Sequence, residues 1–270
     1  MIRFLILSGY FELMMYLMAT GKLNQYINVH YSYLAILSMI LSFILSLVQL
    51  INWVKSNNKP DKESFKAKYK KAFSYLLLAT PLLICLFIPY KSLDASVVDS
   101  KGFTFPLDKE SGTSDDGTSI QYLQPNTSSY FTKSDYDELM KKTLAKYKDS
   151  DEIKIDEKNY MEAMELIYNF PSEFIGKKVS FTGFIYNNSL DGQKYQFLFR
   201  FGIIHCIADS GVFGLMLDEK EEYENNTWVH VEGTIESKYF APYKRNLPTV
   251  LVNKSEKVNK PSNPYVYRTF

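Results

Sequence analysis

The 270-residue sequence lacks the short motifs by which many enzyme families are recognised. It contains no Walker-type phosphate-binding loop, no G-x-G-x-x-G and no H-E-x-x-H. Such motifs supply the backbone N–H groups that hold phosphates or the paired histidines that hold a catalytic zinc ion. Their absence argues against ATP hydrolysis within this chain, and we expect a protein that is not an enzyme.

Cysteine and histidine are scarce as well. Cys85 lies in an apolar run and Cys206 in a more polar part of the chain, so the two cysteines do not predict a disulfide framework. There are three histidines, and no C-x-x-C or H-x-x-x-H spacing is present. The sequence therefore carries no standard zinc-binding pattern.

Charge is distributed unevenly, although the formal net charge is only +1. Residues 1–98 contain ten Lys or Arg and four Asp or Glu, a net of +6, whereas residues 99–270 contain twenty-one and twenty-six, a net of −5. Nucleic-acid binding depends on positive charge that displaces counterions. The acidic second part therefore argues against a nucleic-acid partner, and the chain length favours two modules.

Three long apolar segments predict a transmembrane region over residues 1–90. They cover residues 4–21, 33–54 and 72–89, and each is close to the ~20 residues that a helix needs to cross the hydrocarbon core. A signal peptide is the alternative for the first segment, but Glu12 interrupts it and no convincing cleavage site follows. We expect a three-span protein of the lipid bilayer.

The loops between these segments predict the orientation. Residues 55–71 contain seven lysines against Asp61 and Glu63, whereas residues 22–32 contain a single lysine. Loops rich in Lys and Arg stay in the cytoplasm. We therefore expect the N-terminus in the cytoplasm and everything after Pro89 on the extracellular side of the cell membrane.

Glu12 lies inside the first predicted span, where a carboxylate is costly and by default indicates a functional contact. Two interpretations are open. In the first, Glu12 contacts a partner or another polar group within the membrane. In the second, it lies near the membrane edge, stays protonated or faces another helix of this chain.

Composition and periodicity divide the exterior part into three segments. Residues 91–131 are rich in Ser, Thr, Asp and Gly, which predicts a flexible tether. Residues 132–176 contain two amphipathic helical patterns separated by the short strand pattern "EIKI", and Asp156 is the expected cap of the second helix. Residues 177–270 change to the period of two that is typical of strands.

Five alternating apolar segments follow one another from residue 177. Gly183 in "TGF" and Gly233 in "EGT" lie inside strand patterns, where glycine marks a tight bend. The pattern predicts an OB-like five-stranded β-barrel with a C-terminal extension, and a β-sandwich is the alternative. The expected fold class is a membrane α region of three helices with an exterior α+β domain.

The stretch "FLFRFGIIHCIADSGVFGLML" places His205 beside Cys206, with Asp209 three residues later and His230 on a later strand. Zinc and copper bind imidazole and thiolate, usually in sets of three or four ligands. Adjacent residues of a strand point to opposite faces, so this pair can share a metal only if the strand ends there, as the turn sequence "ADSG" allows. Structural residues, a metal site and redox chemistry are the open interpretations.

Aromatic residues are abundant in the barrel segment. The stretch "YFAPYKRN" brings together Tyr239, Phe240, Tyr243 and Arg245. Rigid aromatic side chains and Arg are typical anchors of interfaces, and OB-like barrels commonly bind ligands on one face. We predict a binding surface at these residues, and a solvated loop is the alternative.

Several of these segments, taken in order, resemble the YcgQ-like permease-subunit family of Gram-positive bacteria. The resemblance is carried by the three spans followed by "FIGKKVSFTGFIY", "FRFGIIHCIADSGVFGLML", "WVHVEGTIE" and "KPSNPYVY". It covers nearly the whole chain and implies a small membrane protein that acts beside a larger multi-span permease. The family tends to have two adjacent cysteines followed by Ala-Asp, so the pair His205–Cys206 weakens a dithiol interpretation.

We therefore expect a non-enzymatic accessory subunit of a membrane permease, without a required cofactor, whose exterior domain binds the partner or the solute. The first alternative is an exterior metal-binding or metal-delivery protein. It would hold zinc or another transition metal through His205, Cys206, Asp209 and His230. The second alternative is a structural envelope protein.

Overall fold

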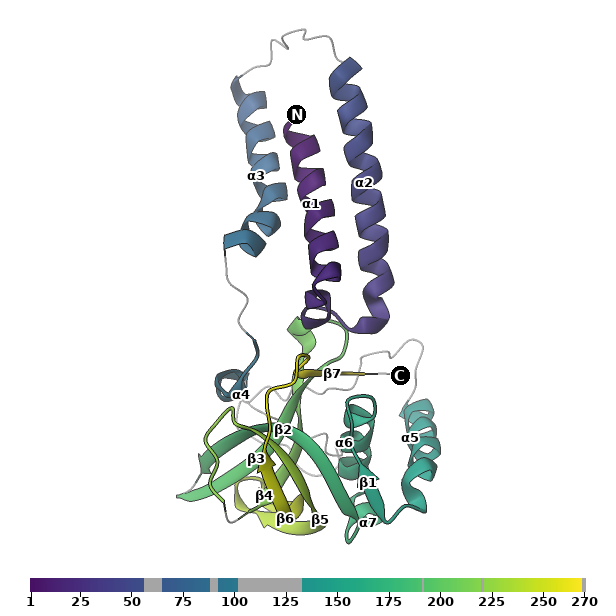
Figure 1. Ribbon diagram of the computed structural model, residues 1–270, viewed down its shortest axis with the longest axis vertical. Helices are drawn as coiled ribbons and strands as arrows, with labels where there is room; N and C mark the ends of the chain where they lie inside the picture. The colour runs from purple at the N-terminus through teal and green to yellow at the C-terminus, as the bar shows by residue number, and fades with distance from the viewer. Residues whose placement is uncertain (56–64, 88–91, 102–132, 191, 220, 269–270) are drawn as a thin grey trace. The chain divides into compact units, whose positions relative to one another are not determined.

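A computed structural model describes residues 1–55, 65–87, 92–101, 133–190, 192–219 and 221–268. The chain divides into two compact units, Met1–Ser92 and Leu93–Phe270. Helices make up the first unit, and a β-barrel with flanking helices makes up the second (Figure 1).

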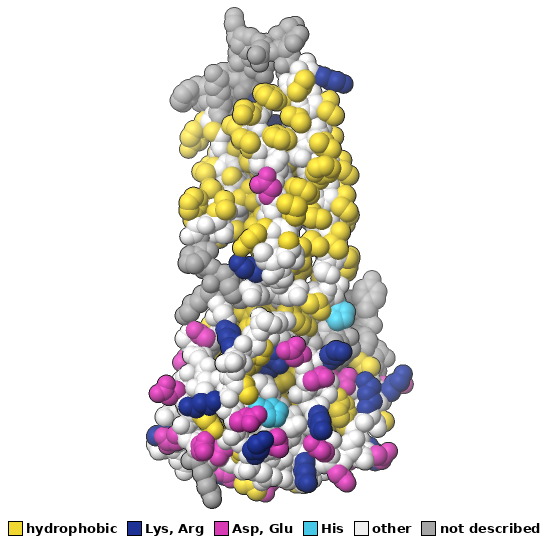
Figure 2. Space-filling view, in the orientation of Figure 1, with side chains coloured by type: hydrophobic (Ala, Val, Ile, Leu, Met, Phe, Trp, Pro, Cys, Tyr) yellow, Lys and Arg dark blue, Asp and Glu magenta, His cyan; other side chains and the backbone are white. Residues whose placement is uncertain are grey.

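The first unit contains three long helices, namely α1 (Ile2–Ala19), α2 (Ser32–Lys55) and α3 (Phe65–Phe87). Two short 3-10 helices, η1 (Lys22–Gln25) and η2 (Val29–Tyr31), connect α1 to α2. By length and composition, α1, α2 and α3 are each able to cross a membrane. Their exposed side chains are mostly hydrophobic, as Figure 2 shows, and such a surface is stable in lipid and not in water. The prediction of three spans is confirmed.

The segment after α3 is packed on the barrel. In the short helix α4 (Ala95–Lys101), the side chains of Ala95 and Val98 are buried in the barrel core. The backbone N–H of Ala95 donates to the side-chain oxygen of Asn226 at 2.8 Å. Residues 95–101, which the prediction placed in the tether, therefore pack on the barrel, whereas residues 91 and 102–132 of the predicted tether lie outside the described residues.

The predicted helical segment contains four elements, namely α5 (Lys133–Lys148), β1 (Glu152–Lys154), α6 (Tyr160–Asn169) and α7 (Pro171–Phe174). The strand β1 pairs in parallel with the first barrel strand. The helix α6 is buried on nearly all sides, because it lies between the barrel and α5.

Asp156 does not cap α6, contrary to the sequence prediction. The cap position is Asn159, three residues later. The carboxylate of Asp156 instead accepts the backbone N–H groups of Lys158 and Asn159, at 2.8 and 3.2 Å. This is an Asx-type turn, in which the side chain organises the approach to the helix and not its first turn.

Six strands follow, namely β2 (Lys178–Leu190), β3 (Gln193–Ile203), β4 (Gly211–Asp218), β5 (Trp228–Phe240), β6 (Arg245–Lys257) and β7 (Tyr265–Tyr267). The sheet order is β1-β2-β5-β6-β4-β3-β7, and an additional pairing of β2 with β3 closes a five-stranded barrel. Within the barrel, β4 and β6 are parallel and the other neighbours antiparallel. This connectivity is OB-like, so the predicted barrel is confirmed and the β-sandwich is not found.

Both predicted strand glycines lie where two backbones approach closely. A Cβ atom at Gly183 would lie 2.6 Å from the backbone oxygen of Phe199. Gly233 follows an irregularity in the pairing of β5 with β6, and a Cβ there would meet the backbone oxygen of Leu251. The two glycines therefore allow the strands to bend around the barrel.

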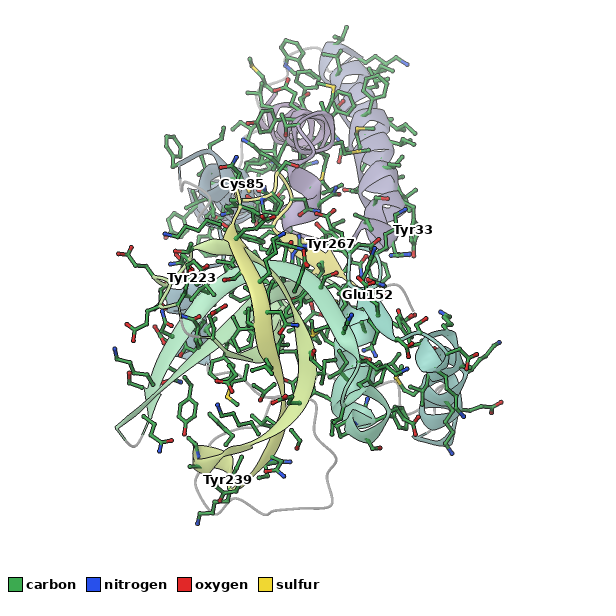
Figure 3. All side chains as sticks on the ribbon, turned by 60° about the horizontal axis from the view of Figure 1, so that its bottom comes forward. Tyr33, Cys85, Glu152, Tyr223, Tyr239 and Tyr267 are labelled. Atoms are coloured by element: carbon green, nitrogen blue, oxygen red, sulfur yellow. The ribbon has the colours of Figure 1, made fainter. Side chains whose placement is uncertain are left out.

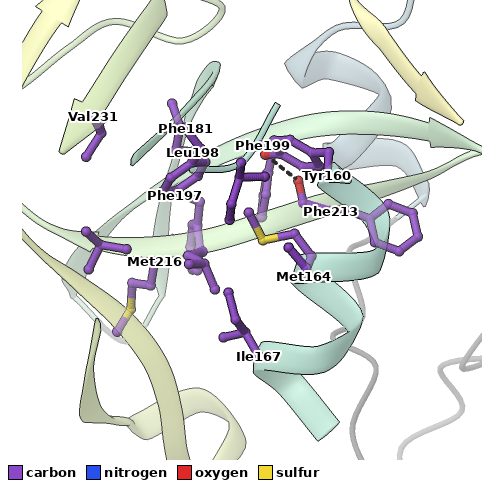
Figure 4. Close-up of a cluster of buried hydrophobic side chains, with 14 of the residues drawn as sticks. Tyr160, Met164, Ile167, Phe181, Phe197, Leu198, Phe199, Phe213, Met216 and Val231 are labelled. Carbon is purple, nitrogen blue, oxygen red and sulfur yellow. Dashed lines mark hydrogen bonds between the residues drawn. The ribbon is translucent and has the colours of Figure 1, made fainter. Parts of the chain in front are cut away.

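Side chains of α6 enter the barrel core. Figure 4 shows Met164 and Ile167 directed toward the aromatic side chains of the strands, among which the rings of Phe197 and Phe199 are stacked with centroids 5.3 Å apart. Tyr160 is also buried, and its hydroxyl donates to the backbone oxygen of Phe213 at 3.3 Å. Helix and barrel thus share one hydrophobic core.

Candidate functional site

The pair His205–Cys206 lies in a turn, because β3 ends at Ile203 and the 3-10 helix η3 (Ile207–Asp209) begins just after the pair. The side chain of His205 is 54% exposed, whereas Cys206 is partly buried and forms no disulfide. The condition for a shared site, that the strand ends before the pair, is therefore met.

Asp209 organises this turn. Its carboxylate accepts the backbone N–H of His205 at 3.1 Å and that of Cys206 at 2.9 Å. The Cys206 sulfur in return accepts the backbone N–H of Asp209, which completes a reciprocal cap of η3. A third contact joins Oδ2 of Asp209 to Nδ1 of His205 at 2.6 Å.

The contacts of Asp209 change its titration. Partial burial raises the pKa of the carboxyl group, but the hydrogen bonds from Cys206 and His205 outweigh it, so the pKa lies below its ordinary value. Because a carboxylate only accepts hydrogen bonds, the contact with His205 places the proton of the neutral ring on Nδ1. Nε2 is then the unprotonated nitrogen.

The structure does not bring the four predicted metal ligands together. His230 belongs to β5, where its Nδ1 lies 2.9 Å from the hydroxyl of Thr182 on β2. Across the described ranges, no group of three or more His, Cys, Asp or Glu side chains is arranged to hold a metal ion. Both carboxylate oxygens of Asp209 are already engaged in the turn. Metal binding by these residues stays a prediction.

The predicted binding surface lies at the connection between β5 and β6, which contains the 3-10 helix η4 (Ala241–Tyr243). Tyr239 is 60% exposed, and Figure 3 shows it at the end of the hairpin. Arg245 is half-buried. The side chain of Tyr243 lies outside the described residues.

Phe240 was expected on this surface, and that expectation is wrong. Its side chain is fully buried, with its ring centroid 4.7 Å from that of Tyr195 and 6.0 Å from that of Phe197. Earlier in β5, buried and more exposed residues alternate, but the residues from Glu236 to Tyr239 are all exposed. The alternation therefore does not predict whether Phe240 is buried.

Arg200 is a buried charged residue that the sequence analysis missed. It is 3% exposed, and its guanidinium donates to the backbone oxygen of Asn263 at 3.1 Å. The same group lies over the rings of Tyr160 and Trp228, 5.7 and 5.6 Å from their centroids. The sequence signal for this contact was an arginine inside the apolar run "FLFRFGII". Because an arginine is almost never fully buried unless it is paired, a buried Arg at this position indicates a partner elsewhere in the domain.

Arg268 forms a second buried contact. It lies 3.3 Å from Glu165 of α6, and the two side chains are 6% and 4% exposed. The strand β7 ends just before Arg268 in the sequence. It pairs in parallel with the residues Phe201 to Ile203 of β3, which follow Arg200. The C-terminal extension is therefore part of the folded domain and not a loose end.

Comparison with known protein families finds two matches. The DUF1980 N-terminal domain matches residues 2–104, and the DUF1980 C-terminal domain matches residues 130–268. Over 274 residues, the chain is 53% identical to a Streptococcus mutans protein named "Putative two-component membrane permease complex subunit". Over 288 residues, it is 36% identical to "UPF0703 protein YcgQ" of Bacillus subtilis. Both alignments cover 100% of each chain. No solved structure matches.

The cap formed by Asp209 generates a prediction of pH-dependent stability. Asp209→Ala removes the acceptor for two backbone N–H groups, and at pH 7 it is expected to lower the free energy of unfolding by about 1 kcal/mol. The folded-state pKa lies below the ordinary value of about 3.9. The carboxylate therefore contributes its full stabilisation of the folded state at pH values above about 3.9. Its contribution is lost as the pH falls through the folded-state pKa.

The measurement is chemical unfolding of the full-length protein in detergent between pH 7 and pH 3. A Trp53→Phe background makes Trp228 the source of the tryptophan fluorescence that follows unfolding. The difference between wild type and Asp209→Ala should shrink below about pH 4. Asp149→Ala, at an exposed position, is the control and should change little. A difference that stays constant down to pH 3 would contradict the role of the carboxylate.

The buried ion pair generates a second prediction. Arg268→Met removes the cation beside Glu165 and is expected to destabilise the domain by about 3–5 kcal/mol, because a charge is left buried. The double variant Glu165→Met with Arg268→Met removes both charges and should recover much of this loss. Unfolding of the three proteins in detergent checks the order, and equal losses in the single and double variants would argue against a coupled pair.

Proposed function

Because the chain belongs to the DUF1980 family, as its sequence resemblance indicated, we propose that it is a non-enzymatic accessory subunit of a multi-span membrane permease. The observation that carries this proposal is the full-length identity of 53% to a protein named as a subunit of a two-component membrane permease complex. Three apolar helices and a separate barrel domain are consistent with a subunit that acts beside a larger partner. The proposal invokes no cofactor.

The barrel domain is proposed to bind the partner or the solute through the connection between β5 and β6. These are the fourth and fifth strands of the barrel, and in OB folds the loop between these strands takes part in ligand binding. Tyr239 and Arg245 flank this connection and offer an aromatic ring and a guanidinium group. Both groups are typical anchors of protein interfaces.

The orientation is also a proposal, namely that the N-terminus is cytoplasmic and the barrel domain extracellular. It is supported by the seven lysines of residues 55–71, which favour a cytoplasmic position for that loop. In this arrangement the permease contact within the membrane and the barrel outside the cell belong to the same subunit.

Single-cysteine labelling tests the orientation. In a background with Cys85→Ala and Cys206→Ala, a membrane-impermeant maleimide should label Tyr239→Cys in intact cells. It should label Lys55→Cys, at the exposed end of α2, only after the membrane is permeabilised. The reverse pattern would contradict the proposed orientation.

Co-purification tests the subunit proposal. The tagged full-length protein is solubilised from its native membranes in mild detergent, and the proteins that accompany it are identified by mass spectrometry. A multi-span permease in comparable amount is the expected result, with an unrelated tagged three-span protein as the control. Recovery of the chain alone, under conditions that keep known complexes intact, would contradict the proposal.

A further inference from the structure

The middle helix of the first unit, α1, uses two of its faces for packing within the chain. Toward α2, the ring of Phe11 lies 5.2 Å from that of Phe43, measured between centroids. Toward α3, the hydroxyl of Tyr10 donates to the backbone oxygen of Leu78 at 2.8 Å. Figure 1 shows α1 between the other two helices. Within the helical unit, the described residues leave a third face of α1 uncovered.

Glu12 lies on that third face. It shares the face with Leu5, Met15 and Tyr16, which recur at helical spacing and are 48–55% exposed. We call these four residues the Glu12 stripe. Glu12 itself is exposed, and its carboxylate has no hydrogen bond or ion pair with the described part of the chain. Figure 2 shows an acidic side chain among the hydrophobic ones of the helices, and Glu12 is the sole Asp or Glu in the described residues of α1 to α3.

The depth of Glu12 makes this exposure costly. Glu12 lies seven positions before Ala19, the nearer end of α1, and at 1.5 Å per residue this is about 10 Å. A glutamate side chain is too short to reach water over that distance. An ionisable side chain inside a membrane almost always faces a protein interior or pairs with another group. Because Glu12 has no pairing group among the described residues, another molecule is the candidate source of one.

A second copy of this chain is a poor occupant of the Glu12 stripe. In a symmetric dimer the same patch of both copies meets, so two Glu12 side chains would lie at the same depth. Like charges repel strongly where the dielectric constant is low. The nearest cation on α1, Arg3, already donates to the hydroxyl of Tyr75 at 3.0 Å. Charge therefore favours a different protein, with a positively charged side chain at this depth.

Resting on the proposed function, we propose that the Glu12 stripe binds a spanning helix of the permease partner. Glu12 accepts a hydrogen bond from a Lys or Arg side chain of that helix, and the apolar members of the stripe pack on either side of the contact. The pairing removes an otherwise unpaired carboxylate from the lipid. It also fixes the position of the partner helix along α1, because the cation of that helix must lie at the same depth in the membrane as Glu12.

Substitution of Glu12 tests the contact in the full-length protein. Glu12→Leu should reduce the permease that co-purifies from native membranes about tenfold, within the range of an interhelical hydrogen bond. Glu12→Gln keeps a hydrogen-bond acceptor and should retain an intermediate amount. Because leucine is more apolar than glutamate, Glu12→Leu inserts into the membrane at least as well as wild type, and its abundance there is measured alongside.

A matched control comes from α2. Ile44 is 49% exposed and lies two residues from the buried Ser46, so it projects from the opposite side of that helix. Ile44→Ala should leave co-purification unchanged. A photo-crosslinking amino acid at Met15 should crosslink to the permease in membranes, whereas the same amino acid at Ile44 should not.

The outcomes separate this inference from the proposed function. Undiminished co-purification of Glu12→Leu, or crosslinks to the permease from Ile44 and not from Met15, would overturn the Glu12 contact and leave the subunit proposal standing. A crosslink from Met15 to a second copy of this chain would overturn the contact in favour of self-association. If wild type recovers no multi-span protein at all, the proposed function fails, and the Glu12 inference fails with it.

Discussion

Burial of α6 against the barrel is the interaction on which the barrel domain depends. The helix is covered on nearly all sides, which forces Glu165 into the interior together with its apolar neighbours. A buried carboxylate needs a cation, and Arg268 from the far end of the chain supplies it. That contact holds β7 beside β3, and Tyr265 of β7 in turn accepts a hydrogen bond from the backbone N–H of Leu93. One packing requirement thus connects α6, the C-terminus and the segment that follows the third span.

Local sequence patterns predicted the parts of the fold that depend on neighbouring residues. Hydropathy identified the spans, and Gly183 and Gly233 indicated the bends of the barrel, because each signal lies within one element. Contacts between distant segments were not predictable in this way. Arg200 meets Asn263 and Arg268 meets Glu165 only after the barrel has closed, and neither pair has a recognisable spacing. Phe240 was misplaced because the exposed hairpin before it no longer alternates.

The turn at His205 shows how the same residues serve a structural role or a chemical one. The sequence placed His205, Cys206 and Asp209 close together, and the structure keeps them close. Most of their hydrogen bonds, however, are formed within the turn, where Asp209 and Cys206 cap η3 reciprocally. A metal at this turn would have to compete with those backbone hydrogen bonds, which are strong because one partner is charged. The geometry therefore favours a structural role for Asp209, while the exposed ring of His205 is the group best placed for chemistry.

The two units differ in whether their charged side chains have partners within the same unit. In the barrel, the buried arginines find carboxylates, carbonyl oxygens and aromatic rings within their own unit. In the helical unit, Glu12 has no such partner among the described residues, although lipid tolerates an unpaired carboxylate far less well than water does. The barrel unit thus pairs the guanidinium groups of its buried arginines, whereas the helical unit leaves the carboxylate of Glu12 unpaired among the described residues. The Glu12 carboxylate lies on the face of α1 that neither α2 nor α3 covers, which is the face that we propose binds a helix of the permease.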